Sequence, residues 1–177
     1  MNNPIVPHEV RRVYEGRIFR VAVETITLPK GQQMQVEVVR HPGSVVLLPI
    51  SGRGELMLVR QYRHAVGRWL WELPAGSLKP GEAEDAAAAR ECQEELGLIP
   101  SRLERLGSFF PTPGYCDEEM VFFRATGLRA PGAGDAAVQP DDDEDIEARA
   151  FAVDEVRQYV ARGDIIDLKT VAGLALL

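Results

Sequence analysis

Four charged residues that stand close together could do chemistry that depends on a divalent cation: Arg90, Glu91, Glu94 and Glu95. Carboxylate oxygens are the hard ligands that Mg²⁺ and Mn²⁺ prefer, and such an ion neutralises phosphate charge and polarises an attacking water. Like charges spaced i, i+4, as at Glu91 and Glu95, cost a helix about 0.2–0.5 kcal/mol. We therefore expect a positive group beside them. The alternative is an acidic face exposed to water, as in most charge runs.

A helix is the element that would bring these carboxylates together. There is no Gly or Pro between Glu82 and Leu96, four alanines stand just upstream of the acidic residues, and Gly97 can close the helix in a left-handed conformation. At about 100° per residue, Ala88, Cys92 and Leu96 share one face, whereas the three glutamates share another. The carboxylates should therefore converge on one side of the helix.

The longer pattern around this helix resembles a known family signature. Gly76 is followed after five residues by Glu82, and after seven more by the run Arg90-Glu91-Cys92-Gln93-Glu94-Glu95-Leu96-Gly97-Leu98. This pattern resembles the signature of the Nudix hydrolase family at every fixed polar and glycine position. The departure is Cys92, where the family usually has a larger aliphatic residue. Cysteine behaves as a small buried hydrophobe, so we expect closer packing at this position.

The resemblance implies a loop-helix-loop that binds Mg²⁺, with Mn²⁺ as an alternative, and that acts on a diphosphate. It implies that Glu91 and Glu95 bind the metal and that Glu94 is a further ligand or the general base. It also implies that Glu82 and Arg90 pair and hold the loop against the helix, which places Arg90 in the catalytic set.

Two stretches outside the motif resemble the ADP-ribose pyrophosphatase branch of this family. In residues 59–76, VRQYRHAVGRWLWELPAG, the resemblance implies that Arg63 contacts the substrate diphosphate and that the carbonyl of Ala75 binds metal. Guanidinium groups suit phosphate oxygens, so Arg60 is a second candidate, with a structural role as the alternative. The resemblance also implies that a proline-rich loop lines the nucleoside side of the pocket, and the alternative is an ordinary tight loop between strands. Its candidate binding residues are Pro111, Pro113, Gly114, Tyr115 and Glu118.

A second group of carboxylates lies in the acidic run at residues 141–145. Such runs are usually solvated. In several relatives, however, a carboxylate from this loop closes over the metals and acts as general base. Asp142 and Glu144 are the candidates, and the sequence leaves the choice open between them and Glu94.

The N-terminal region is predicted to form a β addition. Apolar residues alternate in residues 16–29, a turn follows, and residues 34–41 form a second strand, which together predict an antiparallel hairpin. The resemblance suggests that this hairpin exchanges between the subunits of a homodimer, so that Arg17, Ile18 or Gln35 reaches the partner's site. The alternative is packing on its own chain. Residues 1–12 are expected to be poorly ordered.

The 177 residues, 45% of them hydrophobic, can bury one core. We predict an α/β fold, a Nudix α/β/α sandwich with a mixed central sheet and an additional N-terminal antiparallel β hairpin. The predicted regions are residues 1–42 for the β addition and residues 43–177 for the hydrolase domain. Other predicted elements are strands at SVVLLPI, ELMLVRQYR, residues 102–110, MVFFRATGL and IEARAFAV, and helices at residues 156–161 and 169–177.

Charge and cysteine content narrow the range of partners. A net charge of −7 and a pI near 5.1 argue against a nucleic-acid or membrane-surface partner, which would require a basic surface. Cys92 and Cys116 show no CxxC spacing and are predicted to be reduced thiols in a cytoplasmic protein. No apolar run reaches the roughly 18 residues of a membrane span, and we see no signal peptide.

The predicted function is metal-dependent hydrolysis of the diphosphate bond of ADP-ribose to AMP and ribose 5-phosphate. An alternative is hydrolysis of another nucleoside diphosphate sugar or of an oxidised nucleotide. A third reading is a non-catalytic Nudix module that senses a nucleotide. That reading is disfavoured because such proteins commonly lose acidic positions that this chain keeps.

Overall fold

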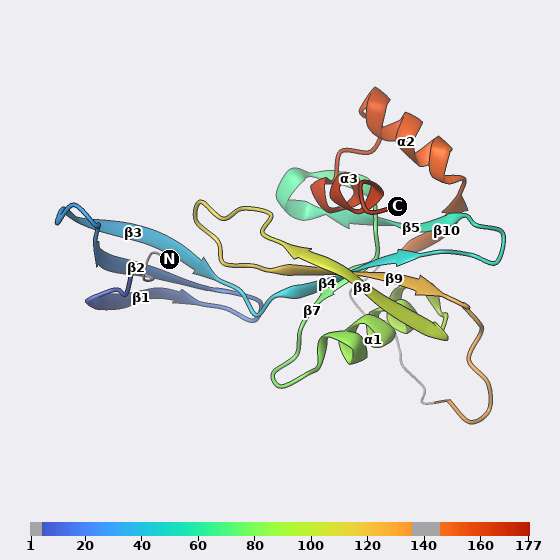
Figure 1. Ribbon diagram of the computed structural model, residues 1–177, viewed down its shortest axis with the longest axis horizontal. Coiled ribbons are helices and arrows are strands. Elements are labelled where there is room, and N and C mark those ends of the chain that lie inside the picture. Colours follow the sequence, from blue (N-terminus) through green and yellow to red (C-terminus); the bar gives the residue numbers. More distant parts are fainter. Residues whose placement is uncertain (1–4, 136–145) are drawn as a thin grey trace.

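The computed structural model describes residues 5–135 and 146–177. Figure 1 shows a layered body in which the helix α1 (Glu84–Leu96) lies on one side of the central strands. The helices α2 (Val153–Arg162) and α3 (Leu168–Leu174) lie on the other side. The predicted α/β/α sandwich is therefore confirmed. Within the described ranges, no helix is long and apolar enough to span a membrane.

The central sheet has the strand order β7-β4-β9-β8 and is mixed, as predicted. The strands β4 and β9 run parallel, whereas the β7–β4 and β8–β9 pairs are antiparallel. All six residues of β4 are buried, as expected for a continuous apolar run covered on both faces. The bounds are β4 (Ser44–Pro49), β7 (Ala75–Ser77), β8 (Arg102–Phe109) and β9 (Met120–Thr126).

A second sheet of the body has the order β10-β5-β6 and is antiparallel. Its strands are β5 (Leu56–Arg63), β6 (Arg68–Glu72) and β10 (Glu147–Phe151), and the short helix η1 (His64–Val66) joins β5 to β6. The last residue of β6 stands two residues before β7, so this sheet leads the chain directly into the motif that begins at Gly76.

The two faces of β4 enter two different hydrophobic cores. Val46 and Leu48 belong to a core that includes residues of α2 and α3, whereas Val45 and Leu47 belong to a core formed with α1. This division follows from the two-residue period of a strand, which points successive side chains to opposite faces. The α1 core includes Cys92, which is fully buried, as predicted for a small hydrophobe.

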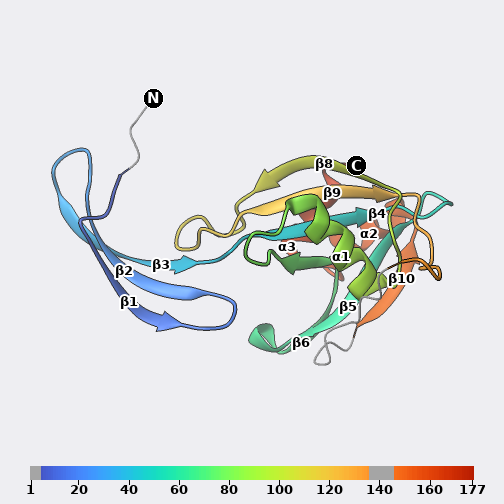
Figure 2. The ribbon, with the colours of Figure 1, turned by 90° about the horizontal axis from the view of Figure 1, so that it is seen from below.

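Three strands at the N-terminus form a separate antiparallel sheet, which we call the arm (Figures 1 and 2). Its strands are β1 (Glu9–Glu15), β2 (Arg20–Thr27) and β3 (Gln33–Arg40). The predicted β2–β3 hairpin is confirmed, but the expectation of a poorly ordered segment through residue 12 was wrong for the residues of β1. All seven residues of β1 are exposed, so no buried face gives this strand a recognisable hydrophobic alternation.

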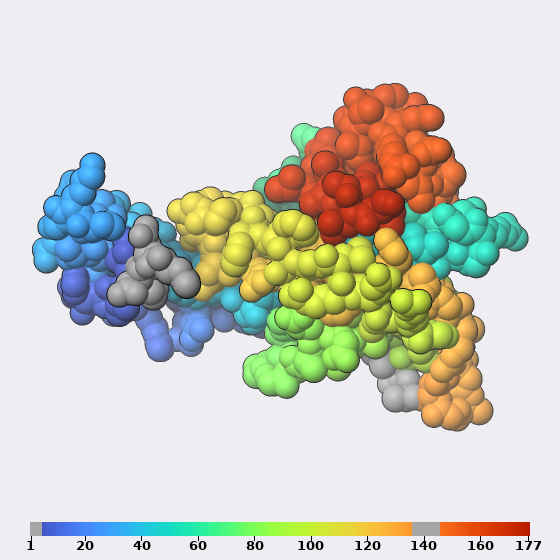
Figure 3. Space-filling view, viewed as in Figure 1, coloured from blue at the N-terminus to red at the C-terminus, as the bar shows by residue number. Residues whose placement is uncertain are grey.

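The base of the arm is fastened to the loop between β8 and β9, and Figure 3 shows the two in contact. Arg40 donates hydrogen bonds to Glu24 within the arm and to Asp117 in that loop, the latter at 3.0 Å. The backbone of Val39 bonds with both Tyr115 and Asp117. These contacts fix the direction in which the arm leaves the body.

Candidate active site

The helix α1 is held so that its acidic side faces β7. Ala87, Ala88 and Cys92 are fully buried against the central sheet, and Gly97 closes the helix in the left-handed conformation with φ of 65°. On the adjoining side, Glu91 and Glu95 are only 7% and 9% exposed. The convergence of carboxylates expected from helix geometry is therefore accompanied by burial, which a solvated acidic face would not show.

Both buried glutamates meet the backbone of β7. The backbone N–H of Ala75 donates to Oε2 of Glu95 at 3.2 Å. The carboxylate of Glu91 lies so close to Gly76 that a Cβ there would overlap it. This close approach explains a glycine at a position whose φ is not in the left-handed region.

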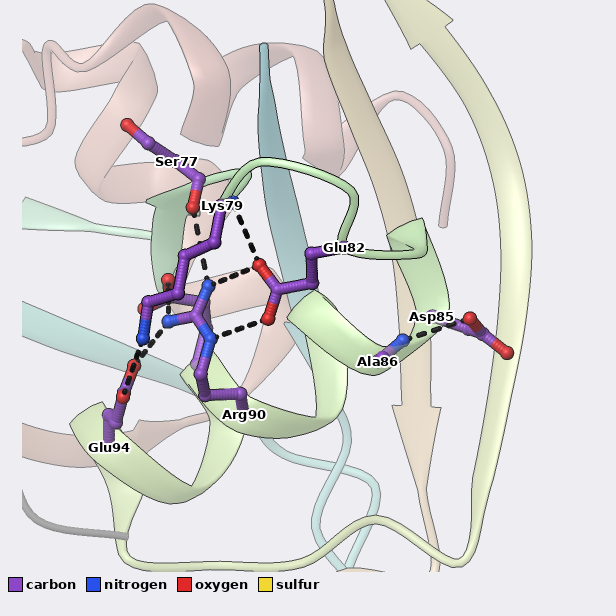
Figure 4. Close-up of polar contacts among 8 residues, drawn as sticks. Ser77, Lys79, Glu82, Asp85, Ala86, Arg90 and Glu94 are labelled. Carbon is purple, nitrogen blue, oxygen red and sulfur yellow. Dashed lines mark hydrogen bonds and ion pairs between the residues drawn. The ribbon is translucent and has the colours of Figure 1, made fainter. Parts of the chain in front are cut away.

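Arg90 ties the loop before α1 to the helix, as Figure 4 shows. Its Nε and Nη2 donate to the two carboxylate oxygens of Glu82 at 2.8 and 2.9 Å, and Nη2 also donates to the Ser77 carbonyl at 3.2 Å. The bond with Glu82 is the main cause of the raised pKa of Arg90, and the same bond is the main cause of the lowered pKa of Glu82. The pairing that the family resemblance implied is therefore present.

The same guanidinium also supplies the positive group expected beside the acidic cluster. Nη1 of Arg90 donates to Glu91 Oε1 and to Glu94 Oε2, both at 2.5 Å. Nζ of Lys79 lies 3.8 Å from the other oxygen of Glu94. Glu94 thus lies at the junction of the helix and the loop, close to two cations.

A cleft of about 690 Å³ lies in front of this cluster and extends to the β1–β2 turn of the arm; we call it the motif cleft. Residues proposed from the sequence that line it are Arg17, Ile18, Arg63, Ala75, Arg90, Glu91 and Glu94. Glu95 lies beside the cleft, bonded to Ala75. Arg17 and Ile18 reach the cleft of their own chain, and their reach to a partner's site stays a prediction.

Three cations in the motif cleft were not proposed from the sequence: Arg20, Arg40 and Lys79. Lys79 stands between Gly76 and Glu82, inside the motif, so its position in the sequence could have identified it as a candidate for the site. Arg20 and Arg40 belong to the arm, and nothing in their sequence context distinguishes them from other surface arginines. Their position reflects the direction of the arm, which is a tertiary feature.

Arg63 enters the motif cleft with one edge of its guanidinium already engaged. Nε and Nη2 donate to Glu72 at 2.9 and 2.7 Å, a bidentate bond that is the main cause of the raised pKa of Arg63. Its side chain is 41% exposed. Within the described part of the chain, Nη1 makes no hydrogen bond, so this nitrogen is the one available to an anion in the cleft.

The proline-rich loop lines a different hollow of about 440 Å³, which we call the side groove. Pro113, Gly114 and Tyr115 line it together with Phe110. Arg40 lines both the side groove and the motif cleft, so the two hollows adjoin at this residue.

Other proposed residues lie elsewhere. Pro111, Gln35 and Glu118 line neither hollow; Glu118 accepts a hydrogen bond from Ser44 at 2.9 Å. Arg60 lies 3.6 Å from Glu147 and over the ring of Trp69, outside the motif cleft. Asp142 and Glu144 fall outside the described residues.

The donor atoms at the motif cleft suit a hard divalent cation. Glu91, Glu94 and Glu95 offer carboxylate oxygens, and Ala75 adds the main-chain carbonyl of a strand that α1 approaches closely because of Gly76. Among the described residues, no three acidic, histidine or cysteine side chains form a ready-made cation group, and Arg90 bonds two of these glutamates. The residues present therefore fit such an ion in donor chemistry, with the backbone oxygen as part of the set.

Comparisons with known proteins identify the family. A family model described as the NUDIX domain matches residues 39–171. An ADP-ribose pyrophosphatase of Mycobacterium tuberculosis is 36% identical over 92% of this chain and 77% of its own length. An ADP-ribose pyrophosphatase of Bacillus subtilis is 30% identical over 94% of this chain and 88% of its own length. A methanol dehydrogenase activator of Bacillus methanolicus is 34% identical over 96% of this chain and 90% of its own length.

The fold has a counterpart among solved structures. The crystal structure of an ADP compounds hydrolase superposes with a TM-score of 0.82 at 21% identity. The match covers 98% of this chain and 92% of the other. At this identity the similarity establishes the architecture, including the arm.

Proposed function

Because this chain belongs to the NUDIX domain family, we propose that it hydrolyses the diphosphate bond of ADP-ribose, giving AMP and ribose 5-phosphate. One structural observation carries the proposal. In the motif cleft, the buried carboxylate of Glu91 lies against Gly76, and Arg63 lines the same cleft; beside it, the buried carboxylate of Glu95 accepts a hydrogen bond from the Ala75 N–H. Two relatives with high coverage are ADP-ribose pyrophosphatases, which favours this substrate over other nucleoside diphosphates.

The reaction we propose is substitution at phosphorus by water. Glu91, Glu95 and the Ala75 carbonyl would hold a divalent cation, which we propose to be Mg²⁺ with Mn²⁺ as a substitute. Such an ion supplies charge that neutralises the diphosphate and makes its bound water more acidic.

The remaining steps belong to side chains of the cleft. Arg63 would orient the diphosphate through Nη1, because its other edge is held by Glu72. Glu94 would accept the proton of the attacking water, and Arg90 would hold Glu94 in place. Asp142 and Glu144 remain alternative proton acceptors by the family resemblance.

A substrate panel with and without metal tests the proposal. Purified protein is incubated with ADP-ribose, other nucleoside diphosphate sugars and an oxidised nucleoside triphosphate, in Mg²⁺, in Mn²⁺ or in EDTA. We expect the highest kcat/KM for ADP-ribose, equal amounts of AMP and ribose 5-phosphate, and no product in EDTA. If ADP-ribose stays intact while another compound is cleaved, the substrate assignment is wrong; if nothing is cleaved, the enzymatic proposal is wrong.

We also propose that the protein is a homodimer formed through the arm, with residues 1–42 as the exchanged region and residues 43–177 as the hydrolase domain. The arm extends from the body (Figure 2). On a single chain it leaves apolar side chains exposed. Those more than 40% exposed on β1 and the following turn are Val10, Val13, Tyr14 and Ile18. The cytoplasmic location expected from the sequence stays a prediction.

A further inference from the structure

A group of four charges, two of them buried, extends from the motif cleft into the body outside the Nudix motif. Glu72, at the end of β6, is 1% exposed, and Lys169, on α3, is 8% exposed. The two residues stand 97 positions apart in the chain and form a direct ion pair. Lysine and glutamate side chains are seldom fully buried unless they are paired with an opposite charge.

The contacts connect this pair to the substrate side of the cleft. Oε2 of Glu72 accepts hydrogen bonds from both Lys169 Nζ and Arg63 Nη2, so one carboxylate oxygen is shared by two cations. Asp167, which caps α3, lies 3.1 Å from Lys169 Nζ on the other side. The order of the group is therefore Arg63, Glu72, Lys169 and Asp167, with Arg63 at the cleft.

The alternation of charge has a consequence for Arg63. If Glu72 had Arg63 as its sole partner, the pair would present almost no net charge to the cleft. The positive charge of Lys169 offsets part of the field of Glu72, so the electrostatic potential beside Arg63 is more favourable to a bound anion. Burial acts to raise the pKa of Glu72, but the bonds and charges of Arg63 and Lys169 outweigh it and lower that pKa, so the carboxylate stays ionised. The hydrogen bond with Glu72 is the main cause of the raised pKa of Arg63, and the charges of Glu95 and Asp167 add to it.

We propose that Lys169 is a positioning residue for substrate binding: by sharing Glu72, it keeps Arg63 oriented toward the diphosphate and offsets the negative charge of Glu72 that would oppose that anion. This inference rests on the proposed function. The α3 helix thus contributes to affinity for the anion without any of its residues lining the motif cleft.

Helix docking is the competing explanation for any effect at Lys169. The Oγ1 of Thr170 accepts a hydrogen bond from the backbone N–H of Leu73 at 2.8 Å, and Gly173 packs against the side chain of Leu73. These contacts attach α3 to the segment that leads into β7. Thr170→Val weakens docking and keeps all four charges, which makes it the matched control. It removes the hydrogen bond from the Thr170 hydroxyl to Asp167 Oδ2, but the backbone N–H of residue 170 still donates to that carboxylate.

The experiment compares Lys169→Met, Lys169→Arg, Asp167→Asn and Thr170→Val with the wild type. The Kd of ADP-ribose is measured by calorimetry in EDTA, where no turnover is expected, and kcat and KM are measured with Mg²⁺. Circular dichroism gives Tm for every variant.

If Lys169 acts through charge, Lys169→Met raises both Kd and KM about three- to tenfold and changes kcat less than about twofold. Lys169→Arg keeps Kd within about twofold of the wild type because the charge remains. Asp167→Asn lowers Kd, since it removes a negative charge and asparagine still caps the helix. Thr170→Val lowers Tm and leaves Kd unchanged.

The proposal is overturned if folded Lys169→Met binds as tightly as the wild type, if folded Lys169→Arg binds as weakly as Lys169→Met, or if Thr170→Val weakens binding as much. If Lys169→Met fails to fold, the Kd of Asp167→Asn tests the proposal instead. A Kd equal to that of the wild type would reject the charge argument. If the wild type neither binds nor cleaves ADP-ribose, the proposed substrate is wrong. The same variants are then titrated with inorganic pyrophosphate, and no binding or no difference in Kd rejects the role of Lys169 as well.

Discussion

The carboxylate of Glu91 lies against the Cα of Gly76, in the space that a Cβ at residue 76 would occupy. The strand β7 and the helix α1 approach each other here because the glycine has no side chain. The same approach brings Ala75 N within 3.2 Å of Glu95. The proposed metal ligands are therefore placed by a steric relationship between two elements.

Replacing Gly76 with alanine should displace the Glu91 carboxylate and lower kcat about 100-fold, because small errors in the position of a reacting group are costly. Gly52→Ala is the matched control, since a Cβ there meets nothing within 4 Å. Steady-state kinetics with ADP-ribose and Mg²⁺ measure the effect. A Gly76→Ala enzyme with the kcat of the wild type would show that this contact does not matter for the reaction.

Replacing Glu94 with glutamine should lower kcat about 10²- to 10⁴-fold with little change in KM, since the proposed proton acceptor is lost while Arg63 and the other ligands remain. Glu84→Gln on the same helix is the control; Glu84 is exposed and bonds Arg105. Normal turnover by Glu94→Gln would remove Glu94 from the mechanism and leave the residues of the acidic run to be tested.

Acid should weaken the fold through Glu72. Its pKa is lowered from an ordinary value of 4.5, so its contribution to the free energy of unfolding is fully present above that value and is lost as the pH falls through the folded-state pKa. At neutral pH, Glu72→Gln should cost about 3–5 kcal/mol, because Arg63 and Lys169 would lose their shared partner.

Denaturant titrations of both proteins across the acidic range measure this prediction. Glu72→Gln should show a shallower fall in stability toward low pH than the wild type. Parallel curves for the two proteins would mean that Glu72 is not the group whose protonation matters.

The two thiols should differ in reactivity. Burial raises the pKa of Cys92 to about 12, and the charge of Glu95 adds to the effect, whereas Cys116 is half-buried. Since the thiolate is the reactive form, a thiol reagent should label Cys116 first in the folded protein and Cys92 only after unfolding. A Cys116→Ser variant that still reacts quickly when folded would show that Cys92 is accessible.

Sedimentation should give a mass twice the 19.6 kDa of one chain. Val13→Asp and Tyr14→Asp place a charge on the exposed apolar residues of β1 and should increase the monomer fraction. Lys30→Asp, in the turn between β2 and β3, is a control for added negative charge. A wild-type protein that sediments as a monomer at all concentrations would rule out the proposed homodimer.

The sequence by itself determined the features that depend on short spacings. Helix geometry gathers the glutamates of α1, Gly97 ends that helix, and the eight-residue spacing of Glu82 and Arg90 allows their pairing. A continuous apolar run likewise predicted β4, and alternation of apolar residues predicted the β2–β3 hairpin.

Only the tertiary structure decided which distant groups meet. Arg60 and Arg63 were both candidates for contacting the substrate diphosphate. Because they are three residues apart, they lie on opposite faces of β5, and Arg63 is the one in the motif cleft. The pairing of Glu72 with Lys169 depends on how α3 docks on the second sheet, and the position of Arg40 depends on how the arm leaves the body. Such contacts follow from the packing of whole elements, which no local spacing in the chain encodes.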